Sequence, residues 1–394
     1  MQVTDIEVIP VRIPTKSRDE ELGLAPYIGG FAIDDQPEDL TLEEALDRCG
    51  DESYRSRLLV RLETDEGIDG WGELPGTADA APMVRAILEH LIAPQLIGQQ
   101  VWNVEALLEH FTDDAYGLGY RDPTAYFGGV EMAMWDALGK AEDKPVYQLL
   151  GGKVRDAAPV AFCMGIMPIE DAQQKAREAQ DHGFSVIKTK GCRYWRRDVE
   201  RMIAIDEAVD GQLDIRLDAN RMWSNDVALR VGAKLAAADV HLEYLEQPID
   251  SDSFGTLERL RQRTTQPIAI NEDAYLPHHV YHAVTADAID AAVVDMHPSG
   301  GLLGLKRLAG LASEANISLA HHSGHDLGIK NAAKAHAYAA MPQLDLAFDC
   351  TLYTATDDIL ETPLELENGR MTVPERPGLA GAVDEGAIER YRTD

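Results

Sequence analysis

One theme repeats along this 394-residue chain from residue 158 onward, and it limits the fold more than any other feature. A short apolar run ends in a charged residue, and a segment with helical periodicity follows. From Lys188 the spacings between successive terminal charged residues are 30, 28, 26, 23, 27 and 27. A strand, a loop and a crossover helix need about this many residues. The eight runs lie at 159–162, 186–188, 215–218, 242–246, 268–272, 291–295, 317–322 and 346–349.

Eight such units predict an α/β chain that closes into a TIM-type barrel. In that fold the carboxyl ends of all strands surround one mouth, where the active site lies. A single charged residue after a strand is usually a solvated loop residue. Seven of them in register are expected to face one another across the mouth.

The first 127 residues lack this repeat and predict a separate α+β domain. Strands are expected over 3–13 and 56–63, and helical periodicity covers 83–96 and 104–111. A long polar insertion separates the two strands. Within it, Gly29-Gly30 is flanked by Tyr27 and Phe31, a pattern that fits either a surface turn or a mobile lid.

Charge and composition exclude several classes of partner. The net charge is −32, from 68 acidic and 36 basic residues, so nucleic acid and anionic lipid would be repelled. Dispersed acidic residues and only eleven lysines are typical of a cytoplasmic protein from a salt-loving organism. No apolar stretch approaches the roughly 18–20 residues of a membrane span, and the opening residues do not form a leader. The four cysteines form no C-x-x-C, which favours buried thiols over zinc or disulfides.

Three carboxylates, Asp218, Glu246 and Glu272, end three consecutive predicted strands. Side by side they would repel one another unless a cation lay between them. Ligands that are all oxygen favour Mg²⁺, with Mn²⁺ also possible, over zinc or copper. The alternative is a glycosidase-like pair of carboxylates, which leaves the third carboxylate without a role.

Two lysines, Lys188 and Lys190, are expected on the same side of one strand end. Ammonium groups about 6 Å apart at an effective dielectric of ~20 repel by roughly 2.8 kcal/mol, which would lower a lysine pKa by about two units. The crowding therefore predicts a general base. Opposite them, Asp295 is expected beside a histidine. His321 and His322 point to opposite faces of their strand, and the pattern does not choose between them.

The ordered set of these residues resembles the enolase superfamily, and within it the mandelate racemase subgroup, glucarate dehydratase and related acid-sugar dehydratases included. The motifs that carry the resemblance are Lys188-x-Lys190, Asp218-x-Asn220, Glu246-Gln247-Pro248, Asn271-Glu272, Asp295 followed by Gly300-Gly301, and His322. Segments 129–136, 145–152 and 373–379 add to it, so that the resemblance covers nearly the whole chain.

The resemblance implies a modified (β/α)7β barrel over 128–358. Residues 1–127 would be the capping domain, with specificity loops at 27–31 and roughly 49–55, and residues 359–394 would return to it. Asp218, Glu246 and Glu272 would bind Mg²⁺. Lys190 would be the base on one face of the substrate and Lys188 would hold the substrate carboxylate. The spacing of 27 from Asp295 selects His322 as acid or base on the other face, and the remaining substrate contacts would be Asn220, Asp349 and Tyr27.

The implied chemistry is removal of a proton α to the carboxylate of a small-molecule substrate. Our first hypothesis is an acid-sugar (aldonate or aldarate) dehydratase that gives a 2-keto-3-deoxy acid. Asp349 and the run 322–326 favour this type, whereas Glu272 is the racemase-like choice. The alternatives are a racemase or epimerase of a 2-hydroxy acid, a cycloisomerase, or a non-catalytic barrel protein. A homo-oligomer is expected, as is usual in this family.

Overall fold

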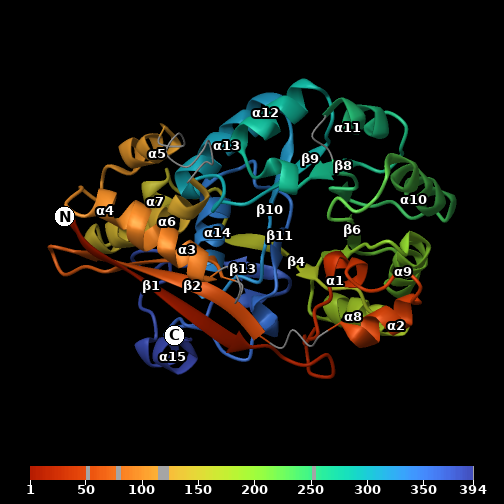
Figure 1. Cartoon of the computed structure of the whole chain (residues 1–394), viewed down its shortest axis with the longest axis horizontal. Helices are drawn as coiled ribbons and strands as arrows, with labels where there is room; N and C mark the ends of the chain where they lie inside the picture. The colour runs from red at the N-terminus through yellow and green to blue at the C-terminus, as the bar shows by residue number, and fades with distance from the viewer. Residues whose placement is uncertain (50–53, 77–80, 114–123, 251–253, 394) are drawn as a thin grey trace.

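The computed structural model describes residues 1–49, 54–76, 81–113, 124–250 and 254–393 (Figure 1). The N-terminal part is an antiparallel sheet of β1 (Val3–Pro14), β2 (Tyr54–Thr64) and β3 (Gly70–Pro75). Helical segments cover it: α3 (Ala81–Ile87), η1 (Leu88–Ile92), α4 (Ala93–Leu96), α5 (Val104–Asp113) and α6 (Thr124–Ala141).

Helix α6 lies against β3 because small residues allow a close approach. A Cβ on Gly72 would lie 1.8 Å from the carbonyl oxygen of Gly129. Phe127, Val130 and Met134 of α6 share one apolar core with the sheet. The predicted domain boundary at 127/128 therefore divides a helix that packs on the N-terminal sheet. The three-domain division stays a prediction.

Eight parallel strands form the barrel, as predicted. Strand β11 pairs with β4, and the order then follows the chain to β10. The strands are β4 (Ala157–Cys163), β5 (Val186–Lys190), β6 (Asp214–Asp218), β7 (Tyr244–Glu246), β8 (Ile268–Ile270), β9 (Ala291–Val294), β10 (Ser318–His321) and β11 (Phe348–Cys350). Their buried apolar runs are typical of parallel strands covered on both faces.

Within the described ranges, seven α-helices connect these eight strands, which confirms the (β/α)7β architecture. They are α8 (Ile169–Asp181), α9 (Trp195–Ala208), α10 (Asn225–Ala237), α11 (Phe254–Arg261), α12 (Pro277–Thr285), α13 (Gly301–Ala315) and α14 (Gly328–Ala340). Helix α7 (Val146–Leu149) precedes the barrel.

The Gly300-Gly301 motif has a packing explanation. Both glycines have positive φ, 89° and 90°, at the start of α13. The buried carboxylate of Glu131 accepts hydrogen bonds there from the N–H groups of Leu302 and Leu303, at 2.8 and 2.9 Å. A Cβ on Gly301 would lie 2.0 Å from a Glu131 oxygen, so this contact requires glycine.

The segment after β1 leaves the sheet and crosses to the barrel. Its helices α1 (Gly30–Asp34) and α2 (Leu42–Arg48) lie beside α8 and α9 (Figure 1). Arg193, in the β5–α9 loop, fixes the crossing by donating to the carbonyl oxygens of Asp34, Gln36 and Pro37 at 2.8–3.0 Å.

The C-terminal part contacts both halves of the molecule. After η4 (Leu352–Thr354), the hairpin of β12 (Leu366–Glu367) and β13 (Arg370–Thr372) pairs with β4. Helix α15 (Glu385–Tyr391) then lies against β1.

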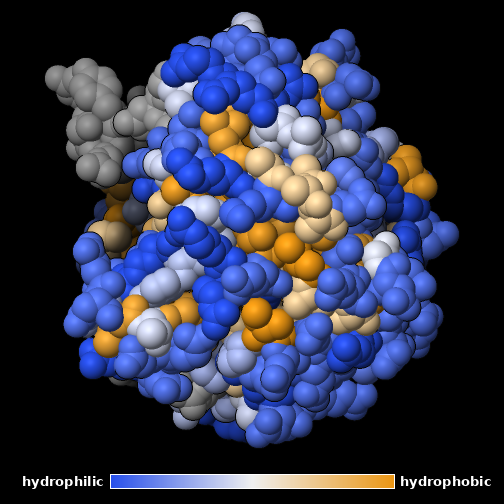
Figure 2. All heavy atoms as spheres, turned by 90° about the vertical axis from the view of Figure 1, so that its right-hand side faces the viewer, coloured by the Kyte–Doolittle hydropathy of each residue, from blue (hydrophilic) through white to orange (hydrophobic). Residues whose placement is uncertain are grey.

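The outer face formed by the barrel helices is mostly hydrophilic, with an apolar band near its middle (Figure 2). Among the helices in the described ranges, none has both the length and the apolar character needed to cross a bilayer.

Candidate active site

Strand register brings the predicted residues of the barrel mouth to one level. Lys190 is the in-register partner of Asp218, and Asp218 is that of Glu246. Side chains in register on neighbouring parallel strands point the same way, so these three face one space. Glu272 follows β8 at the start of η3 (Glu272–Ala274).

Both lysines contact carboxylates. Lys190 Nζ lies 2.6 Å from Asp218 Oδ2. Lys188 Nζ lies 2.7 Å from Glu246 Oε1 and 2.6 Å from Asp349 Oδ2. The cluster therefore joins the predicted lysines to two of the three predicted metal ligands and to Asp349.

The expectation that crowding lowers the lysine pKa is wrong for this arrangement. Burial and the neighbouring ammonium do lower the pKa of Lys190, but Asp218, Tyr27 and Glu246 together outweigh them and the pKa is raised. Burial likewise opposes the charge of Lys188, yet Asp349, Glu246 and Asp218 hold its pKa well above the usual range. The carboxylates dominate because they touch the ammonium groups.

The oxygen ligands of Asp218, Glu246 and Glu272 suit a hard divalent cation, although the three side chains do not yet form a complete coordination site. Among the described residues, no three His, Cys, Asp or Glu side chains are arranged to hold a metal ion as they stand. Lys188 and Lys190 contact carboxylate oxygens of Glu246 and Asp218 that a metal ion would otherwise bind. Yet Glu246 Oε2 and Glu272 Oε2 are buried without a hydrogen-bond partner, and burial and the charge of Asp218 raise the pKa of both groups. A cation would stabilise their ionised forms; the metal ligands stay a prediction.

Asn220 connects Glu272 to this cluster. Its Nδ2 donates to Glu272 Oε1 at 3.1 Å and its backbone N–H donates to Asp218 Oδ1 at 2.9 Å. Its φ of +44° is a conformation that non-glycine residues rarely adopt. Such strain persists only where the surroundings fix the backbone.

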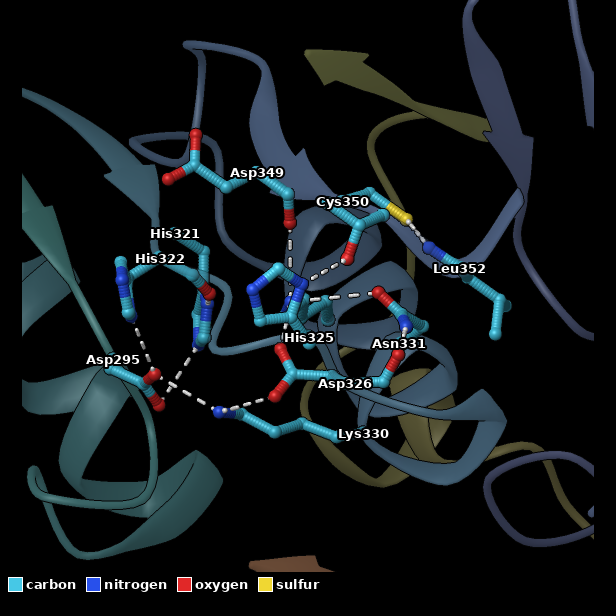
Figure 3. A network of polar contacts seen from close by, with 12 residues as sticks. Asp295, His321, His322, His325, Asp326, Lys330, Asn331, Asp349, Cys350 and Leu352 are labelled. Atoms are coloured by element: carbon cyan, nitrogen blue, oxygen red, sulfur yellow. Dashed lines mark hydrogen bonds and ion pairs between the residues drawn. The ribbon is translucent and has the colours of Figure 1, made fainter. Parts of the chain in front are cut away.

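The two neighbouring histidines, His321 and His322, have different hydrogen-bond partners (Figure 3). His322 Nδ1 lies 3.3 Å from Asp295 Oδ2. His321 Nε2 instead accepts the N–H of Met296 at 3.0 Å, and its Nδ1 faces the His322 carbonyl oxygen at 2.6 Å. Both ring nitrogens of His321 are thus used by the backbone. Burial lowers the pKa of His322, so its ring is neutral at pH 7.

Lys330 is a site residue that the sequence patterns did not indicate (Figure 3). Its Nζ lies 3.0 Å from Asp295 Oδ2 and 3.2 Å from Asp326 Oδ1, and all three side chains are buried. Lys334, one turn further along α14, contacts the other oxygen of Asp326 at 2.5 Å. Asp295 is therefore shared between His322 and a buried ammonium, and its pKa is held well below the usual range against burial.

The N-terminal sheet supports this network. Glu73 of β3 accepts the N–H groups of Leu327 and Lys330, at 2.7 and 3.0 Å, at the start of α14. Arg57 of β2 lies 3.4 Å from Glu73 and 3.8 Å from Asp326. In the sequence, these contacts could have been anticipated from charged residues, Arg57 and Glu73, that lie within otherwise apolar strands.

Tyr27 belongs to the predicted specificity loop at 27–31, and it lies close enough to Lys190 and Lys188 for their charges to act on it. Its ring packs edge-on against His325, with centroids 4.5 Å apart. Burial raises the pKa of its phenol, and the charges of Lys190 and Lys188 act in the opposite direction. The second predicted loop, roughly 49–55, includes 50–53, which lie outside the described residues.

Two family profiles match the chain. The mandelate racemase/muconate lactonizing enzyme N-terminal domain matches residues 49–151, and the enolase C-terminal domain-like profile matches residues 171–387.

Curated relatives include dehydratases and a racemase. An arabinonate dehydratase of Saccharolobus solfataricus is 29% identical over 85% of this chain and 90% of its own length. A D-xylonate dehydratase of Haloferax volcanii is 29% identical over 86% of this chain and 85% of its own. An N-succinyl-L-Arg/Lys racemase of Bacillus cereus is 27% identical over 86% and 91%.

Solved structures share the whole fold. An enolase from Streptomyces coelicolor is 30% identical, with a TM-score of 0.83, over 99% of this chain and 96% of that chain. A racemase from the same organism with bound magnesium is 22% identical, with a TM-score of 0.82, over 99% and 100%. The chain therefore belongs to the enolase superfamily, in its mandelate racemase/muconate lactonizing enzyme family.

Proposed function

We propose that this protein is a Mg²⁺-dependent acid-sugar dehydratase. The observation that carries the proposal is the arrangement at one barrel mouth of the Lys188–Lys190 pair, the carboxylates around it, and the His322–Asp295 pair. The dehydratase names of two relatives, an arabinonate and a D-xylonate dehydratase, support the reaction class.

Each group has a role in the proposed reaction. A bound Mg²⁺ supplies positive charge where negative charge develops on the substrate carboxylate. Lys188 holds that carboxylate beside the metal ligands. Lys190 ends β5 and His322 directly follows β10, on different walls of the barrel. The neutral His322 can take a proton from the α-carbon, and the Lys190 ammonium can give one to it.

Dehydration then follows from proton transfer through His322. The neutral imidazole takes the α-proton, and the electron pair of the C–H bond forms the double bond as the β-hydroxyl leaves. The imidazolium returns the proton to the departing oxygen as water. The resulting enol becomes a 2-keto-3-deoxy acid. Asp295 holds the ring in place and stabilises the imidazolium.

Racemisation of a 2-hydroxy acid is the second candidate. It needs the same two groups, Lys190 and His322, with removal from one face and return from the other. Glu272 at the third ligand position and the racemase among the relatives favour it. It requires no β-hydroxyl on the substrate.

A panel of aldonates, aldarates and 2-hydroxy acids with Mg²⁺ tests the proposal. Semicarbazide detects 2-keto acids, and NMR in ²H₂O detects exchange or inversion at the α-carbon. Formation of a 2-keto acid from an acid sugar is the expected result. Exchange or inversion without loss of water, across the panel, would instead establish the racemase. We also propose that the protein is cytoplasmic, that it comes from a salt-loving organism and that it forms a homo-oligomer.

A further inference from the structure

Arg55, on β2, is a buried cation that no carboxylate of the described residues neutralises. It is 2% exposed and forms no ion pair within 4.0 Å in that part of the chain. Its guanidinium donates to the hydroxyl of Thr351 at 2.7 Å, to the Thr351 carbonyl oxygen and to the hydroxyl of Thr354. These acceptors are neutral, and Nε has no partner.

Of the neighbouring acids, two are paired with other cations, and Asp358, whose pKa the charge of Arg55 lowers, forms no ion pair with Arg55 within 4.0 Å in the described part of the chain. Glu73 pairs with Arg57, and Asp326 pairs with Lys330 and Lys334. Arg57 is two residues from Arg55 on the same strand, so the two positive charges repel one another. Burial and Arg57 lower the pKa of Arg55 to about 10. An unpaired buried charge destabilises the fold, and an anionic ligand would offset this cost.

The Arg55 side chain lies beside the segment around Tyr27 and the loop that follows β10. With Tyr27, Tyr54 and His325 it lines a cavity of about 20 Å³. That space holds about one water-sized group, so a larger ligand enters only when the segment around Tyr27 moves. Both Tyr27 and His325 are close enough to Lys190 for its charge to lower their pKa.

The distance to the reacting end suits a sugar acid. Thr351, which accepts from Arg55, follows Asp349 by two residues, or about 7 Å of extended chain. Asp349 contacts Lys188, the residue proposed to hold the reacting carboxylate. Five carbon–carbon bonds of ~1.5 Å span about 6 Å in a zigzag. The far end of a six-carbon acid therefore reaches the neighbourhood of Arg55.

We propose that Arg55 binds a second carboxylate at the far end of the substrate, so that the preferred substrates are sugar diacids rather than monoacids. The inference rests on the proposed dehydratase function. Arginine suits this role because its planar donors match a carboxylate. The neutral threonine oxygens keep the guanidinium in place without neutralising it.

The test compares aldonates with aldarates of the same length and configuration. For the wild type, kcat/KM is expected to favour the diacid. Arg55→Met should lower kcat/KM for the diacid by about 10- to 100-fold, the range for a lost charge-assisted hydrogen bond. Its effect on the monoacid should be severalfold smaller. Arg55→Lys should recover part of the diacid activity. Arg230→Met is the control, because Arg230 is an exposed arginine on the outer barrel helix α10, away from the residues that line this cavity.

A wild type that prefers monoacids would overturn the inference while leaving the dehydratase proposal intact. Equal losses on both substrates in Arg55→Met, with folding verified by thermal unfolding, would also overturn it and indicate a structural role. If Arg55→Met does not fold, the wild-type ratio and Arg55→Lys decide the matter. Absence of 2-keto acid formation from any acid sugar would instead refute the dehydratase proposal.

Discussion

Replacing Lys330 with methionine should change both the stability of the protein and the proton affinity of His322. Lys330 is the buried ammonium that shares Asp295 with His322, at 3.0 and 3.3 Å from the same carboxylate oxygen. Methionine preserves much of the side-chain length but removes the charge. Asp295 would then keep only histidines as partners, with His297 Nδ1 at 2.9 Å and His322.

The expected magnitudes follow from these contacts. Removing one partner of a buried ion pair costs about 3–5 kcal/mol. The low end applies here, because Asp326 keeps Lys334 and Asp295 keeps two histidines. The two contacts to the shared oxygen, 3.0 and 3.3 Å, place the two nitrogens no more than about 6 Å apart, and unit charges at that distance repel by about 2.8 kcal/mol at a dielectric of ~20. The pKa of His322 should therefore rise when the ammonium is removed.

The assay is the pH dependence of kcat/KM, supported by urea unfolding. In Lys330→Met the acid limb should move to higher pH, because His322 must lose a proton at a higher pH before it acts as a base. Lys334→Met is the control: it removes another buried ammonium on α14 that does not contact Asp295, so it should lose stability without moving the limb. A folded Lys330→Met enzyme with an unchanged limb would refute the coupling.

Three further results are expected. Burial raises the pKa of Glu131 to about 7. The stability that the protonated carboxyl contributes is complete below about pH 4.5 and is lost as pH rises through 7, so Glu131→Gln should lessen the fall in unfolding free energy between pH 6 and 8 by about 1.4 kcal/mol. Gly301→Ala should lower the free energy of unfolding in urea by about 3 kcal/mol or more, because the new Cβ would overlap Glu131 and the residue has a positive φ. Gly310→Ala is the control: there is open space around its Cβ, so it should raise the free energy of unfolding by about 0.5–1 kcal/mol. Arg193→Met should raise KM severalfold by releasing the crossing segment, and unchanged KM would show that this segment does not cover the substrate.

The sequence predicted the barrel because its signal is local. Each strand is a short apolar run that ends in a charged residue, and the spacing of about 27 residues leaves room for one helix. The same signal located Lys190, Asp218 and Glu246 at one level, since neighbouring parallel strands align their ends.

Other parts of the site depend on contacts between segments far apart in the sequence. Lys330 lies on a helix, where a lone lysine gives no indication of burial, and its partner Asp295 is 35 residues away. The pKa of Lys190 was predicted with the wrong sign, because the sequence shows the neighbouring ammonium but not the Asp218 oxygen at 2.6 Å. The choice of His322 over His321 needed the resemblance, because the sequence does not show that both ring nitrogens of His321 face backbone groups.

Proton NMR in ²H₂O with Mg²⁺, on the wild type and on His322→Asn, tests the central claim most directly. The wild type should remove the α-proton of the acid sugar that it converts best and give a 2-keto-3-deoxy acid carrying deuterium at C3. His322→Asn should be slower by about a hundredfold or more, with the fold preserved. Equal rates in the two proteins would contradict the assignment of proton transfer to the His322–Asp295 pair.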